Sequence, residues 1–263
     1  MPTLKLHHLL AAPLLALALA TPAIADGIKV TARYAITLGG THIAQANVTL
    51  DDTGTAYSMA LDAKISGLAQ LVASGTARLA STGVSSGTGL KSRKFDLLTR
   101  ANGEDFSVAI TYANAGVESF VVDPPIINNI DRVAIERKQL GAVNDMAAAF
   151  VLRGKALDPA LCDRKLQIFN GIERFNLSLA FAKDDVATSK RTGYQGPVVA
   201  CRVRYTPISG HYTTSEVTTY LAQNDRILIW YAPLATPGYF IPYRALVTTE
   251  AGDISIVLTE LTQ

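Results

Sequence analysis

Apolar and polar side chains alternate through Ile28-Lys29-Val30-Thr31-Ala32-Arg33-Tyr34-Ala35-Ile36-Thr37-Leu38, with the larger apolar residues at the even positions. Because successive side chains of a β-strand point to opposite faces of the sheet, this period of two predicts a long strand with one buried face. Gly39-Gly40 ends the run, and the segment from Ala44 to Leu50 alternates again directly afterwards. A glycine pair between two alternating runs predicts a β-hairpin.

The same period recurs along most of the remaining chain. Asn170-Gly171 is the strongest hairpin signal, and it lies between the alternating runs Lys165–Phe169 and Arg174–Phe181. Because open twisted sheets of more than about ten strands curl or close, we expect an all-β, mainly antiparallel fold over residues 26–263, either a single curved sheet or an open β-barrel. Further strands are predicted at Tyr57–Ile65, Ala77–Ala80, Lys91–Asp96, Phe106–Tyr112, Val117–Val122, Val198–Tyr205, Ser215–Leu221, Arg226–Tyr231, Tyr243–Glu250 and Ile254–Leu261.

One short helix is predicted at Asp145–Arg153. Asn144 can cap its amino end, Ala149 and Phe150 share a face with Met146, and Gly154 supplies the stop. We expect this helix to plug or cap the sheet.

The amino terminus has the pattern of a secretory signal peptide. Lys5 precedes an apolar run from Leu9 to Ala20, and Ala23-Ile24-Ala25 supplies the small residues of a cleavage site. We therefore expect residues 1–25 to be removed and residues 26–263 to form one β-rich domain that is periplasmic or secreted. No later run reaches the eighteen or so apolar residues of a membrane helix, so we expect no transmembrane segment in the mature chain.

Charge and cysteine content narrow the function classes. The formal net charge is only +2, with no clustered basic face, which argues against nucleic acid as a partner. Cys162 and Cys201 are the two cysteines of the chain. In an oxidising compartment such a pair is typical of a disulfide, and the alternative is two buried free thiols.

A catalytic or metal centre has little support. Gly83-Val84-Ser85-Ser86-Gly87 matches the G-x-S-x-G pattern of serine hydrolases, with His211 downstream. That mechanism needs a strand, a sharp turn and a helix, whereas the surrounding residues favour a flexible β-turn. His42 and His211 are the only histidines after the signal segment, too few for a zinc site without carboxylates. We expect no metal, no cofactor and no enzymatic activity.

Three arginines are candidates for ligand binding. Arg174, Arg204 and Arg244 each lie in or beside a predicted strand next to an aromatic residue, which is Phe175, Tyr205 or Tyr243 respectively. A guanidinium at a barrel mouth could hold a carboxylate or phosphate headgroup above an apolar cavity, with Tyr205 and Tyr243 beside it. The alternative, a solvent-facing arginine or a buried ion pair, is favoured.

The second half of the chain resembles the bacterial exported family called domain of unknown function 3108. The likeness lies in Ile168–Phe175, Gly193–Gly196 leading to Val199-Ala200-Cys201, Pro207–Gly210 and Pro242-Tyr243-Arg244, and more loosely in Tyr34 and Ile65–Leu68. Asn170 stands where the family pattern has Asp, and either residue makes the hairpin. The resemblance implies a curved antiparallel sheet or open barrel similar to lipoprotein-carrier folds, and it implies no reaction.

Three functions follow from these observations as hypotheses. The leading one is a non-enzymatic periplasmic protein that binds an amphiphilic ligand, such as a lipid, or a component of the cell envelope. The second is an envelope scaffolding protein that binds another protein and whose barrel is filled by side chains. The third is a hydrolase that uses Ser85. An apolar cavity of about 300 Å³ or more would favour the first hypothesis over the second.

Overall fold

The computed structural model describes residues 27–263 apart from 72 and 115, and in these residues fourteen strands form one antiparallel sheet. The strand order is β7-β6-β5-β4-β3-β2-β1-β14-β13-β12-β11-β10-β9, and β8 pairs with β13 beside this path. The predicted fold, a single curved antiparallel sheet or open barrel with one short helix, is confirmed.

The first half of the chain forms a meander of long strands. The hairpin expected at Gly39-Gly40 joins β1 to β2, in which Leu38 pairs with Thr41. The strands of this half are β1 (Ile28–Leu38), β2 (Thr41–Asp52), β3 (Ala56–Ile65), β4 (Gly75–Ser86), β5 (Gly89–Ala101), β6 (Glu104–Ala113) and β7 (Gly116–Asp123).

The second half returns to β1 from the other side. β14 pairs with β1, so the strand quoted first in the sequence lies between the two halves of the sheet. The remaining strands are β8 (Leu152–Arg153), β9 (Arg164–Phe169), β10 (Arg174–Ala187), β11 (Gly196–Ser209), β12 (Ile227–Pro233), β13 (Tyr239–Thr249) and β14 (Gly252–Thr262). Short 3-10 helices are η1 (Gly67–Leu71), η2 (Arg137–Leu140), η3 (Ala148–Phe150) and η4 (Pro159–Cys162).

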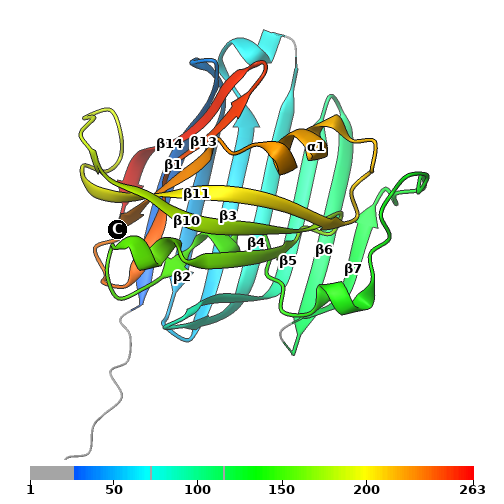
Figure 1. The fold of residues 1–263 in the computed structure, drawn as a ribbon, viewed down its shortest axis with the longest axis horizontal. Helices are drawn as coiled ribbons and strands as arrows, with labels where there is room; N and C mark the ends of the chain where they lie inside the picture. The colour runs from blue at the N-terminus through cyan, green and yellow to red at the C-terminus, as the bar shows by residue number, and fades with distance from the viewer. Residues whose placement is uncertain (1–26, 72, 115) are drawn as a thin grey trace, which may run out of the picture.

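The sheet curls until its two ends meet through side chains rather than through a ladder. Figure 1 shows β10 and β11 crossing in front of β3 to β6. Phe169, at the end of β9, packs edge-on against Phe120 of β7 with ring centroids 5.0 Å apart. Its backbone carbonyl accepts a hydrogen bond from the Tyr112 hydroxyl of β6 at 3.4 Å. β7 and β9 are the two ends of the strand order, and the barrel is therefore open.

The helix predicted at Asp145–Arg153 is wrong. The segment holds only the 3-10 turn η3, and Leu152–Arg153 pairs with β13. The carboxylate of Asp145 accepts hydrogen bonds from the backbone N–H groups of Ala147 and Ala148, at 2.7 and 2.8 Å. These bonds cap a first turn, and the turn ends at Phe150 because Val151 has an extended backbone and the next two residues pair with β13.

The strand predicted at Ser215–Leu221 is also wrong, because this segment forms the α-helix α1 (Glu216–Gln223). The Ser215 hydroxyl caps the helix by accepting the N–H of Thr218 at 3.2 Å. Val217 and the threonines that follow it favour a strand, but capping by serine favours a helix start. Val217 is 70 % exposed and Thr218 is the one buried residue of α1, so the segment lacks the alternating buried face of the sheet strands.

The predicted disulfide is present. Cys162 of η4 and Cys201 of β11 are bonded, with their Cα atoms 5.4 Å apart, and both side chains are fully buried. The bond therefore links η4, which precedes β9 in the chain, to β11.

Candidate functional site

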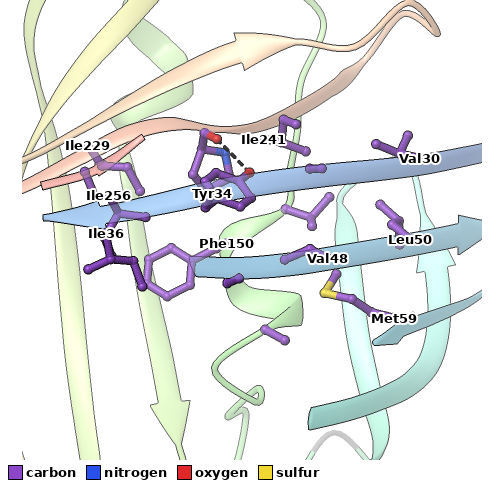
Figure 2. A pocket seen from close by; sticks show the side chains of 16 residues that line it. Val30, Tyr34, Ile36, Val48, Leu50, Met59, Phe150, Ile229, Ile241 and Ile256 are labelled. Atoms are coloured by element: carbon purple, nitrogen blue, oxygen red, sulfur yellow. Dashed lines mark hydrogen bonds between the residues drawn. The ribbon is translucent and has the colours of Figure 1, made fainter. Parts of the chain in front are cut away.

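An apolar cavity of about 270 Å³ lies inside the curl of the sheet, against β1 (Figure 2). Its wall is made by the inward faces of strands from both halves of the chain and by one turn of the segment that precedes β8. The lining residues are Val30, Ala32, Tyr34, Ile36, Ala46, Val48, Leu50, Met59, Ala147, Phe150, Val151, Ile229, Ile241, Pro242, Ala245 and Ile256.

The period of two in the sequence explains why this surface is apolar. The even-numbered residues of β1 from Val30 to Ile36 all line the cavity, and so do those of β2 from Ala46 to Leu50. Within these two rows Ala32 and Ala46 carry only a methyl group. Because a larger residue at either position would extend into the interior, these two alanines leave the space open.

The cavity presents no free polar side chain. Among the lining residues only Tyr34 has a hydroxyl, and that hydroxyl donates to the carbonyl of Pro242 at 2.8 Å. Burial raises the pKa of Tyr34 well above its ordinary value, so the ring stays neutral. The surface is therefore suited to hydrocarbon rather than to a charged group.

The turn at Ala147–Val151 forms one wall of the cavity, and Asp145 fixes it in place. Asp145 is fully buried, and its carboxylate accepts hydrogen bonds from the Ser81 hydroxyl at 2.6 Å and from the Ser92 hydroxyl, in addition to the two backbone N–H groups described above. Tyr57 reaches the same cluster through Ser81 at 2.9 Å. Because each of these groups is satisfied, the wall is held rigidly against β4 and β5.

A polar cluster follows the apolar row of β2. Asp52 comes two residues after Leu50 and is buried. Its carboxylate accepts from the Ser85 hydroxyl at 2.6 Å and lies 3.8 Å from a guanidinium nitrogen of Arg153. That guanidinium also stacks 3.5 Å above the centre of the Tyr239 ring.

Ser85 has the surroundings of a structural residue. It lies within β4, so the turn predicted around Gly83–Gly87 is wrong for residues 83 to 86. Its side chain is 4 % exposed and its hydroxyl donates to Asp52. A serine nucleophile needs an accessible oxygen at a strand-to-helix turn, and β4 leads into another strand instead.

A comparison with known families matches residues 33–259 to the family described as "Protein of unknown function (DUF3108)". The chain belongs to the DUF3108 family. A solved structure with a similar fold is described as a beta-barrel-like protein of domain of unknown function DUF1849 from Brucella abortus. It shares 9 % sequence identity at a TM-score of 0.49, and the match covers 90 % of this chain and 98 % of that one. A search of curated proteins found no match.

The residues that carry the DUF3108 likeness around Asn170 close the curl of the sheet. The Asn170 side-chain oxygen accepts from the N–H groups of Ile172 and Glu173, at 2.9 and 2.7 Å. Arg132 donates to the carbonyl of Ile172 at 2.8 Å and to that of Gly210 at 2.7 Å. An aspartate at position 170 would accept the same two hydrogen bonds, so the departure from the family pattern leaves the turn intact.

Arg174 of this DUF3108 protein is buried in hydrogen bonds to the protein itself. Its side chain is 5 % exposed, and burial lowers its pKa. The guanidinium donates to the carbonyl of Gln139 at 3.0 Å, to the Asn176 side chain at 2.7 Å and to the Gln167 side chain at 2.9 Å. These bonds join β9 and β10 to η2.

The other candidates lie on two separate strands. Arg204 is exposed on β11, and the buried ring of Tyr205 packs on Phe175 with centroids 5.4 Å apart. Arg244 of β13 is half-buried, with its guanidinium 5.2 Å from the centre of the Trp230 ring. The Tyr243 hydroxyl donates to Thr192 at 3.2 Å. None of the five residues Arg174, Arg204, Arg244, Tyr205 and Tyr243 lines the apolar cavity.

Sequence reasoning did not single out the cavity residues, although a signal for them existed. Small residues at inward positions of adjacent strands, Ala32 and Ala46, mark a place where the interior is not filled. The signal segment 1–25 lies outside the described residues. Within the part of the chain that is described, no helix is long and apolar enough to cross a membrane.

Proposed function

We propose that this DUF3108 protein is an exported, non-enzymatic binding protein that holds the hydrocarbon part of an amphiphilic ligand in its cavity. The observation that carries the proposal is the apolar cavity of about 270 Å³ behind Tyr34. This volume lies slightly below the value of about 300 Å³ set out above, and the support for a ligand comes from the lining, which is apolar apart from the bonded hydroxyl of Tyr34.

The cavity favours ligand binding over a scaffolding role. Protein interiors are close-packed, and an engineered apolar cavity of about 150 Å³ already binds small hydrocarbons. A scaffold needs no such space, because its interior can be filled by side chains. The fixed turn at Ala147–Val151 adds to this argument, since a rigid wall keeps the cavity open without a ligand.

Export is part of the proposal. The signal-like pattern that ends at Ala25 and the disulfide between Cys162 and Cys201 both support an oxidising compartment such as the periplasm. In that compartment the proposed ligand is a lipid or another amphiphile of the cell envelope.

The first experiment is native mass spectrometry of the protein purified from the periplasm without detergent, followed by extraction and identification of small molecules. Ala46→Phe fills the cavity, and we expect it to remove most of a co-purifying amphiphile. Ala60→Phe makes the same change at an exposed position of β3 and serves as the matched control. Urea unfolding of both variants checks that they fold.

Competition with a fluorescent fatty acid gives a second measurement. We expect the wild type and Ala60→Phe to bind the probe saturably and Ala46→Phe to lose most of this binding. The proposal is overturned if the wild type neither carries an amphiphile nor binds the probe, or if the two phenylalanine variants bind it equally. Those results would favour the scaffolding alternative.

A further inference from the structure

A second cleft, of about 230 Å³, lies beside the apolar cavity and has a different character. Its walls are the start of β5 with the turn before it, the segment that leads into β8, and the first half of β9. The lining residues in these walls are 88–92, 142–144, 148, 149, 151, 152 and 164–167, together with Tyr112. Val151 contributes to both the cleft and the cavity, so the two share the segment that contains η3.

Three cationic residues line this cleft, and no lining residue of the described chain is acidic. The cations are Lys91, Arg164 and Lys165. None of the three belongs to an ion pair among the described residues. Elsewhere on the molecule exposed lysines and arginines do pair with carboxylates, for example Lys183 with Asp185 at 2.8 Å.

Asp145 is linked to the cleft through the hydroxyl of Ser92, which lines it, and it forms no ion pair with these cations. It is fully buried beneath Ser92. Both of its oxygens already accept hydrogen bonds, one from hydroxyl groups and the other from the backbone N–H groups of Ala147 and Ala148.

Arg164 is held in a fixed position at the wall of the cleft. Its Nε donates to the carbonyl of Leu161 at 3.1 Å, and its Nη2 donates to the carbonyl of Arg153. Its Nη1 has no hydrogen-bond partner among the described residues. The opposite wall is also fixed, because the Asn144 side chain donates to the carbonyl of Leu90 at 2.7 Å and accepts the N–H of Ser92 at 2.8 Å.

We propose that this cleft binds a phosphate group. The Arg164 guanidinium is already held in place and its Nη1 is left to donate, which suits binding of an oxyanion. Lys91 and Lys165 add two compact positive charges to the same cleft. One carboxylate would balance only one of the three charges, whereas a phosphate carries up to two negative charges and several acceptor oxygens. The group can come from free phosphate or from the phosphorylated head of an amphiphile, and the chemistry of recognition is the same.

The test is calorimetric titration of the purified protein with inorganic phosphate and, separately, with a single-chain lysophospholipid below its micelle concentration. The decisive variant is Lys91→Ala/Lys165→Ala, since both side chains are exposed and we expect their removal to leave the fold intact. Lys29→Ala/Lys64→Ala removes the same charge from exposed positions of β1 and β3 and is the matched control. We expect the decisive variant to bind at least about tenfold more weakly and the control to bind like the wild type.

The two titrations separate the sources of the phosphate. Lysine-dependent binding of inorganic phosphate with an affinity similar to that of the lipid supports a site for the free anion. Lysine-dependent binding of the lipid that is much tighter, and that Ala46→Phe also weakens, supports a headgroup site used together with the apolar cavity. The proposal is overturned if neither compound binds, or if the two double-lysine variants bind alike. A lipid that depends on Ala46 but not on Lys91 and Lys165 would overturn the phosphate site and leave the cavity function standing.

Discussion

The hydroxyl of Tyr34 on β1 donates a hydrogen bond to the carbonyl of Pro242 on β13, at a distance of 2.8 Å and across 208 positions of the chain. β14 lies between these two strands in the sheet. Pro242 sits at a bulge in the pairing of β12 with β13, where a residue without an N–H group is tolerated. The bond fastens the two halves of the sheet and leaves the ring of Tyr34 as a purely apolar wall of the cavity.

Tyr34→Phe is expected to destabilise the fold by about 1–3 kcal/mol, because it leaves the partly buried carbonyl of Pro242 without its donor. The free energy of unfolding in urea measures this change. Tyr212→Phe is the matched control, since its hydroxyl also donates to a backbone carbonyl, that of Asn128 at 2.7 Å, but at the surface. Equal losses for the two variants would contradict the role given to the buried bond.

Gly171→Ala is expected to be much more damaging than Gly103→Ala. Both glycines have a positive φ, 92° and 91°, so each substitution meets the same backbone strain, about 1–2 kcal/mol. A Cβ at Gly171 would in addition lie 2.2 Å from a methyl carbon of Val108, whereas one at Gly103 meets nothing within 4 Å. The difference between the two variants in the free energy of unfolding in urea then measures how much the contact between the β9–β10 turn and β6 stabilises the fold. Similar unfolding midpoints would show that this contact does not hold the curl closed.

Reduction of the disulfide between Cys162 and Cys201 is expected to lower the free energy of unfolding by about 4 kcal/mol. The two residues are 39 positions apart, and the value follows from the chain entropy that the cross-link removes from the unfolded state. Unfolding in urea with and without a reductant measures it, and both sulfur atoms remain in the core in either condition. A Cys162→Ala/Cys201→Ala variant should be less stable than the reduced wild type, because it also loses packing. An unchanged midpoint on reduction would contradict the prediction.

Asp185 is expected to add a small acid dependence to stability. The Lys183 ammonium at 2.8 Å, then the Trp230 indole N–H at 3.0 Å and the Val186 backbone N–H, lower the pKa of Asp185 to about 2. Because the folded pKa lies below the unfolded value of about 3.9, this stabilisation is present above about pH 4 and is lost as the pH falls towards 2. The pair is largely solvated, so the loss is below about 1 kcal/mol.

The Asp185→Asn variant measures this contribution. Its free energy of unfolding should fall short of the wild-type value at pH 6, and the two should converge near pH 2. A difference that is the same at both pH values would show that the carboxylate charge is not its cause.

Asp145→Ala is expected to cost about 2–4 kcal/mol and to weaken binding of the fluorescent fatty acid. The change leaves the buried hydroxyls and N–H groups around it without an acceptor, and it frees the turn that forms a wall of the cavity. Asp158→Ala removes a similar acceptor at the exposed start of η4, where it binds the N–H of Ala160 at 3.0 Å. This control should lose about 1 kcal/mol and keep its probe binding. Normal probe binding by Asp145→Ala would show that the turn does not shape the cavity.

Much of the sheet could be predicted because the sequence signals for its strands and hairpin turns each span only a few neighbouring residues. The alternation from Ile28 to Leu38 marks a strand and its buried face, and Gly39-Gly40 and Asn170-Gly171 mark turns between strands that follow one another in sequence. The prediction failed where a local signal was overridden or two signals competed. The turn that Asp145 caps does not extend into a helix because Leu152–Arg153 pairs with β13, and at Ser215 a cap starts a helix among β-branched residues.

The candidate site depended on contacts that sequence cannot supply. Arg174 was singled out for its charge and its aromatic neighbour, but its hydrogen bonds to Gln139 and Gln167 arise only when β9, β10 and η2 are packed together. The cavity joins β1 and β2 to residues of β12, β13 and β14, about 200 positions later in the chain.

Most of the strands, their inward faces and most of the turns follow from the sequence alone, because alternation and turn chemistry act over a few residues. The sequence also supplied the cysteine pair and the family likeness. Three relationships appear only when the strands are packed together: the sheet curls until Phe169 meets Phe120, Ala32 and Ala46 face an unfilled space, and Lys91 lies in one cleft with Lys165. These relationships join residues far apart in the chain, and they depend on how strongly each strand twists and where each bulge falls, which no single segment encodes.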